Sequence, residues 1–323
     1  MSAYLPEIII NAGIFSMFFA LISTELMAAS SLLFKYEEST KKVIPFIIPI
    51  WEITGTFFIF YAVNMESLIP SVLPFLAYAF IVYILIFLIL YIGRNSAIIV
   101  AETIWKNKFI SKKSLYRIYA IITYIIGAII FVLYTALISG KGVNFNAQTF
   151  NLLKFVAYLP DDGFIIGSAI LVFGLASVFY GLNVNRFLPL IVTVIGLIIA
   201  AVSFLKLNDI HNLYYLIIPV ILTILAPVLY IIPSARKLIS NKILFQTVIA
   251  LATFFIIASL YPNMLGGTAT ITPLLNDSAM QIQTFYATVV GGIMLFILTY
   301  VFFKVAYFKN RSGEANLPEE VTQ

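Results

Sequence analysis

The sequence contains no cysteine, a single histidine and few charged residues. Of its 323 residues, 10% are charged and 62% are hydrophobic, with a mean hydropathy of +1.05. A soluble domain averages about 25% charged and about 45–50% apolar residues. The absence of cysteine excludes disulfides, thiolate-bound metals and iron–sulfur clusters held by this chain. The scarcity of charge excludes an ordinary soluble protein and predicts a polytopic membrane protein.

Nine apolar stretches are long enough to cross a bilayer, which takes about 20 residues per helix. They are residues 8–33, 43–63, 71–93, 118–139, 163–182, 187–205, 213–233, 243–261 and 285–303. The polar stretches between them are too short for a soluble domain. We therefore expect an all-α polytopic membrane protein with about nine transmembrane helices, forming one domain over residues 1–310. The composition of residues 311–323 is typical of a disordered tail.

Basic residues are distributed unevenly between the two sides of the predicted membrane. Sixteen of the 19 Lys and Arg fall after the first, third, fifth and seventh spans and in the C-terminal tail. Lys and Arg accumulate in cytoplasmic loops. We therefore expect a multi-pass protein of the plasma membrane, with its N-terminus outside and its C-terminus in the cytoplasm. The net charge of +5 then reflects contact with lipid headgroups, not with nucleic acid.

Two glutamates lie inside these apolar stretches at matching depth. Glu25 is nine residues before the first loop, and Glu52 is nine residues after the second stretch begins. At about 1.5 Å per residue, both lie about 13 Å from the cytoplasmic face. Because a carboxylate there is costly, it usually faces a bundle interior and handles protons or ions. We expect an interior acidic pair; the alternative is that both are neutral, hydrogen-bonded packing groups.

Residues that bind haem or metals are almost missing. The only histidine, His211, falls in a short loop between two predicted spans. Haem in a membrane generally needs histidine ligands, sometimes with methionine. The sequence also has no P-loop, no hydrolytic triad and no metal-ligand spacing. We therefore expect no cofactor bound by this chain's own side chains.

Four motifs, in the same order, are similar to those of subunit II of the cytochrome bd-type quinol oxidases. Pro-Ile-Trp-Glu at 49–52 matches the family's Pro-x-Trp-Asp sequence, and Glu-Leu-Met-Ala at 25–28 matches an Asp-Met-Gly-type stretch. Arg94 and Glu102 match the family's Arg…Phe-Glu pair. Residues 259–278 are similar to its last external loop. The nine predicted spans extend this resemblance over essentially the whole chain.

The resemblance implies a haem-free subunit of a quinol:dioxygen oxidoreductase in a respiratory chain. The haems would belong to the partner, subunit I, in a heterodimer that takes electrons from the quinol pool. This chain would be non-catalytic, would stabilise subunit I, and would supply a cytoplasmic proton path with Glu52 as the deep relay and Glu25 as its neighbour. The family's two four-helix bundles and one peripheral helix would accommodate the nine spans. A structural quinone or lipid is compatible with the family, but the sequence does not locate its site.

Five other residues are candidates for supporting roles near the two acids. Thr24 and Thr54 could hold bridging waters, or could bond back to carbonyls of their own helices. Trp51 could pack in the core, or against a quinone, a lipid or a partner helix. Arg94 and Glu102 could form an ion pair at the inner interface, or extend separately toward water. The sequence also departs from the family, because both matching acids are glutamates in place of aspartates.

Two functions from other classes also fit the residues. One is a quinone-site membrane anchor of another respiratory complex, which would also lack haem. The other is a proton-coupled secondary transporter using Glu25 and Glu52. A transporter is expected to show an internal repeat with interrupted helices in both halves. The acids here crowd into the first three spans without a counterpart in the second half, which favours the oxidase subunit.

Overall fold

The computed structural model describes residues 5–104, 110–208, 210, 212–239, 241–275 and 278–312. These residues form eight helices that are long and apolar enough to cross a membrane, together with one shorter apolar helix. The predicted all-α polytopic membrane fold with about nine spans is therefore confirmed. The predicted tail lies outside the described residues, except Arg311 and Ser312, which end the last helix.

The long helices follow one another with short connections. They are α1 (Leu5–Phe34), α3 (Ile44–Leu68), α5 (Ile81–Ile99), α6 (Lys112–Ser139), α8 (Leu159–Tyr180), α9 (Leu188–Phe204), α10 (Ile217–Ile231), α12 (Lys242–Leu260) and α13 (Ser278–Ser312). Short helices are α2 (Tyr36–Lys42), α4 (Val72–Ala79), α7 (Leu152–Val156) and α11 (Arg236–Ile239). A π-helical turn, η1 (Val100–Ile104), continues α5, and a 3-10 turn, η2 (Leu213–Leu216), precedes α10.

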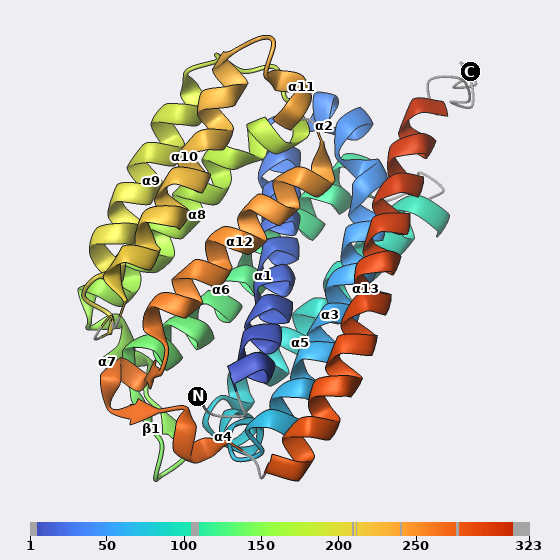
Figure 1. Ribbon diagram of the computed structural model, residues 1–323. Helices are drawn as coiled ribbons and strands as arrows, with labels where there is room; N and C mark the ends of the chain where they lie inside the picture. Colours follow the sequence, from blue (N-terminus) through green and yellow to red (C-terminus); the bar gives the residue numbers. More distant parts are fainter. Residues whose placement is uncertain are drawn as a thin grey trace.

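Two small antiparallel hairpins lie together at one end of the molecule, which we call the hairpin end (Figure 1). Strand β1 (Val143–Asn144) pairs with β2 (Thr149–Phe150), and β3 (Asn263–Met264) pairs with β4 (Ala269–Thr270). The opposite end carries α2, α11 and the C-terminal end of α13. We call it the basic end, because the loops rich in Lys and Arg lie there.

Helix α1 lies in the middle of the molecule (Figure 1). It packs against α3 and α6 on one side and against α8 and α12 on the other. Helices α8, α9, α10 and α12 form one group, and α1, α3, α5 and α6 form the other, with α13 packed along α3. All residues of α1 from Ala20 to Leu32 are buried. A helix that is apolar on all sides is typical of such a central position.

The contact between α8 and α9 depends on glycine. A Cβ on Gly167 would lie 2.4 Å from the backbone nitrogen of Ala200, and one on Gly196 would lie 2.5 Å from that of Leu171. Both distances are shorter than atoms can approach. Small residues let membrane helices come close enough for backbone-to-backbone packing, so these two helices form a tight pair.

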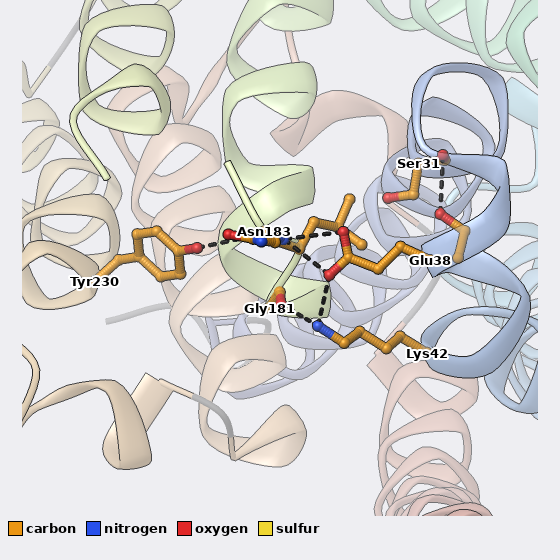
Figure 2. Close-up of polar contacts among 8 residues, drawn as sticks. Ser31, Glu38, Lys42, Gly181, Asn183 and Tyr230 are labelled. Atoms are coloured by element: carbon orange, nitrogen blue, oxygen red, sulfur yellow. Dashed lines mark hydrogen bonds and ion pairs between the residues drawn. The ribbon is translucent and has the colours of Figure 1, made fainter. Parts of the chain in front are cut away.

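At the basic end, a polar connection joins the two groups of helices (Figure 2). The Glu38 carboxylate in α2 accepts the Asn183 N–H at 2.8 and 3.0 Å and Lys42 Nζ at 2.7 Å. Lys42 Nζ also donates to the carbonyl of Gly181, just after α8, at 2.6 Å. Partial burial alone would raise the pKa of Glu38, but the hydrogen bonds from Lys42 and Asn183 outweigh it and lower that pKa.

The third predicted span, residues 71–93, is wrong in its bounds. That stretch contains both α4 and most of α5, separated by a non-helical residue, Phe80, with φ −115° and ψ 18°. The Phe80 ring packs at 6.4 Å from Phe75 and 4.7 Å from Phe150, measured between centroids. This aromatic cluster holds a turn within a continuously apolar sequence, where hydropathy gives no signal. The span therefore runs later, over Ile81–Glu102.

Candidate functional site

Glu25 lies in the fully buried part of α1, where its carboxylate cannot reach solvent. Arg94 of α5 donates from Nη1 to Glu25 Oε2, and the two side chains are only 4% and 5% exposed. The Arg94 guanidinium also lies over the ring of Tyr91, 4.8 Å from its centroid. The centre of this helix group therefore contains a buried ion pair between α1 and α5.

The position of Arg94 follows from the corrected third span. The sequence placed Arg94 just after a span, but α5 continues to Ile99 and then through η1, so Arg94 lies inside the helix. Neither predicted arrangement of Arg94 and Glu102 occurs. Glu102 instead pairs with Lys112 at 3.2 Å and accepts a hydrogen bond from Tyr116.

The ion pair removes much of the cost of burying each charge. Replacing a buried pair by apolar residues is often tolerated, but removing one partner typically costs about 3–5 kcal/mol. Glu25 thus contacts a cation in the core, whereas the alternative considered for it was a neutral, hydrogen-bonded packing group. The second oxygen, Glu25 Oε1, is buried and has no hydrogen-bond partner among the described residues.

A cavity of about 250 Å³ lies beside the ion pair, lined by α1, α3, α5 and α6. Its polar lining includes Glu25, Arg94, Thr54 and Thr123, and the remaining lining is mainly apolar. The Trp51 indole of α3 donates from Nε1 to the Tyr91 hydroxyl of α5 at 3.0 Å. Trp51 thus packs, half-buried, against a neighbouring helix of its own chain.

Glu52 lies on the exposed surface of α3, and its predicted interior position is wrong. It begins an exposed stripe that continues through Thr56, Ile59 and Val63 at helical spacing. Its neighbour Ile53 faces the core instead. Matching depth along the chain did not place the two acids together, because depth does not fix the direction in which a helical side chain points.

The threonines bond back to their own helices, as one of the two alternatives proposed. Thr24 donates to the carbonyl of Ala20 at 3.0 Å, and Thr54 to that of Ile50 at 2.7 Å. Thr24 Oγ1 also accepts a hydrogen bond from Gln246 Nε2 of α12.

Gln246 is a buried polar residue that sequence reasoning missed. The signal was available, because it is a lone amide within the apolar run of α12. Its hydrogen bond to Thr24 connects α12 to the central helix one residue before Glu25. The polar centre of the protein therefore extends from Arg94 on α5 across α1 to α12.

No cluster of three or more His, Cys, Asp or Glu side chains occurs within the described ranges. His211 lies outside them. No metal site can therefore be assigned among the side chains that the structure describes.

The arrangement is that of a multi-pass membrane protein with a buried ion pair between its central helix and α5. A scan against models of protein families found no match, and a search of curated proteins found none. Among solved structures, a chain of the bd oxidase from Geobacillus thermodenitrificans is similar, with a TM-score of 0.69 and 17% sequence identity. The match covers 94% of this chain and 99% of that chain. At this identity the similarity establishes a shared fold.

Proposed function

We propose that this chain is the haem-free subunit II of a cytochrome bd-type quinol oxidase. In this role it stabilises a haem-bearing subunit I in a heterodimer and supplies a cytoplasmic proton path that uses Glu52 and Glu25. It would be a non-catalytic member of an oxidoreductase complex in the plasma membrane, with its basic end in the cytoplasm. The shared fold with a bd oxidase chain and the four motifs in register support this assignment.

The exposed carboxylate of Glu52 is the observation that carries the proposal. A charged side chain near the bilayer centre costs about 2.5–3.5 kcal/mol when it faces lipid. Glu52 and Thr56 are exposed on the same face of α3 as the apolar residues Ile59 and Val63. A partner that covers this face of α3 would remove the cost. A proton path at the junction of the two subunits would then have a carboxylate from this chain.

The first experiment is purification of the tagged chain from native membranes, followed by a reduced-minus-oxidised optical spectrum. We expect haem bands and a co-purifying multi-span partner. A preparation without haem or partner would contradict the proposal and would favour a transporter. A haem-free respiratory complex would favour the quinone-site anchor.

The proton path is tested in that complex by Glu52→Gln, with Glu66→Gln as the matched control. Glu66 is also exposed on α3, but it lies near the hairpin end. We expect Glu52→Gln to slow quinol oxidation by about tenfold or more with haem content retained, because a relay that cannot ionise no longer transfers protons. Unchanged turnover would exclude the proton path, and loss of haem would show a role in assembly instead.

A further inference from the structure

Two buried tyrosines lie on one face of α6. Tyr116 and Tyr119 are each 1% exposed and are separated by one helical turn, about 4.5 Å along the axis. The Tyr116 hydroxyl donates to Glu102. Thr123, one turn beyond Tyr119 on the same face, lines the cavity beside the ion pair. This face of α6 therefore runs from a carboxylate near the basic end to the ion pair at the centre.

Glu102 is accessible from water, unlike the groups further inside. Its side chain is 28% exposed and pairs with Lys112, which is 39% exposed. It belongs to η1, the π-helical turn that follows α5. Single π-helical turns occur frequently at functional sites. Glu102 is thus a carboxylate at the basic end from which a chain of hydroxyls begins.

Two polar atoms near the ion pair are buried and have no hydrogen-bond partner among the described residues: the Tyr119 hydroxyl and Glu25 Oε1. Thr123, one turn further along α6, donates its hydroxyl hydrogen to the Tyr119 carbonyl at 2.7 Å, so it cannot donate to the Tyr119 hydroxyl. Leaving a buried polar group unpaired costs about 1–3 kcal/mol. Buried waters typically satisfy such groups, and one water between these atoms would pair both.

We propose that protons enter at Glu102 and pass along α6 to Glu25 Oε1, through the hydroxyls of Tyr116 and Tyr119 and through bound waters that bridge the gap between the two hydroxyls and the gap from Tyr119 to Glu25. This route deepens the proposed function and rests on it for its biological role. Each oxygen gains one proton from the Glu102 side as it releases another inward, so only O–H bonds form and break. An ionised carboxylate can only accept a hydrogen bond. The hydrogen bond from Tyr116 to Glu102 therefore represents the state after a proton has passed inward. The Tyr116 hydroxyl must rotate before Glu102 can transfer the next proton.

Arg94 determines which oxygen of Glu25 takes part in this route. Its guanidinium donates to Oε2, so Oε1 is the oxygen that receives the proton and passes it on. The onward direction is the cavity of about 250 Å³ beside the pair, which has room for several waters at about 30 Å³ each. Ile59, which follows Glu52 and Thr56 in the exposed stripe of α3, also lines this cavity, so the cavity opens toward that face.

The test is Tyr119→Phe in the purified complex, with Tyr124→Phe as the matched control. Both changes delete one hydroxyl from α6 and keep the ring, but Tyr124 bonds to Ser30 and not to the ion pair. We expect Tyr119→Phe to slow quinol oxidation by about tenfold with haem retained, and to raise the H2O/D2O rate ratio. Tyr124→Phe should stay within about twofold of wild type. Equal behaviour of the two variants would overturn the route.

A second measurement does not depend on oxidase activity. Radiolytic footprinting of the purified chain in ¹⁸O-labelled water marks buried side chains that touch bound water. We expect label on Tyr119 and little on Tyr180, which is also buried but donates to the Thr24 carbonyl at 3.4 Å. No label on Tyr119 would overturn the bound water. If the wild-type preparation lacks haem, the proposed function is wrong. The footprint then still tests whether bound water contacts Tyr119.

Discussion

Glu25 and Glu52 carry the same side chain in neighbouring helices, but their surroundings differ. Glu25 is enclosed by α1's neighbours and paired with Arg94, whereas Glu52 is exposed on α3 and none of the described residues is seen to form an ion pair with it. The buried acid is compensated within the chain. The exposed acid can be compensated only by something outside it. Depth in the membrane therefore sets the free-energy cost of a charge. The helix face on which the charge lies determines whether its partner comes from the same chain or from another molecule.

The largest effect is expected from removing the cation of the buried pair. Arg94→Met should lower the free energy of unfolding by about 3–5 kcal/mol, because it leaves an uncompensated carboxylate in the core. The double variant Arg94→Met with Glu25→Leu should recover most of that loss. Unfolding in mixed micelles measures both. A cost below about 1 kcal/mol for Arg94→Met would show that the pair is not closed in the folded chain.

A smaller effect is expected at Glu38, which is paired but lies at the boundary with water. Its pKa in the folded protein is lowered by Lys42 and Asn183, so its contribution is present above the ordinary value of 4.5 and is lost as the pH falls through the folded pKa. Glu38→Gln should cost about 1 kcal/mol at neutral pH and progressively less below 4.5.

The matched control for that pH dependence is Glu37→Gln. Glu37 pairs with Lys113, but its side chain is 83% exposed. We expect no measurable difference from wild type at any pH, because exposed pairs contribute little. If both variants showed the same pH dependence of unfolding, the connection between α2 and the α8–α9 loop would not be the cause.

The smallest effect on the chain itself is expected for Glu52→Leu. Glu52 is exposed on α3, so this change should remove less than about 0.5 kcal/mol from the isolated chain, and any shift should be toward higher stability because a lipid-facing charge is removed. Glu25→Leu, measured beside it, should destabilise the chain because Arg94 is left unpaired. A large loss for Glu52→Leu would mean that this acid has a partner within the chain, and the comparison would fail.

The membrane spans were predictable because hydropathy reports burial in lipid or in protein directly. The turn at Phe80 was not, since an aromatic cluster built from α4 and β2 holds it and both its flanks are apolar. That single error placed Arg94 at the membrane interface, although it lies in the core. The pairing of Glu25 with Arg94 therefore could not be predicted from the sequence, although both residues are site candidates there.

The orientation of the acids was unpredictable for a different reason. Each residue along a helix turns by about 100°, so a shift of two residues in the assumed packing reverses a side chain from core to surface. The bonds of Thr24 and Thr54 to their own helices needed no tertiary information, because the carbonyl four residues earlier is always within reach. Gln246 required knowledge that α12 packs on α1.

The pairing of Glu25 with Arg94 also constrains how the chain is made. Sixty-nine residues separate the two, so α1 is synthesised well before the cation that it needs. A lone charge released into hydrocarbon costs about 2.5–3.5 kcal/mol, and α5 carries a similar penalty with Arg94. Lateral release of either helix is therefore more favourable when the other is present. The ion pair thus favours release of α1, α3 and α5 from the insertion machinery as a group over release one at a time.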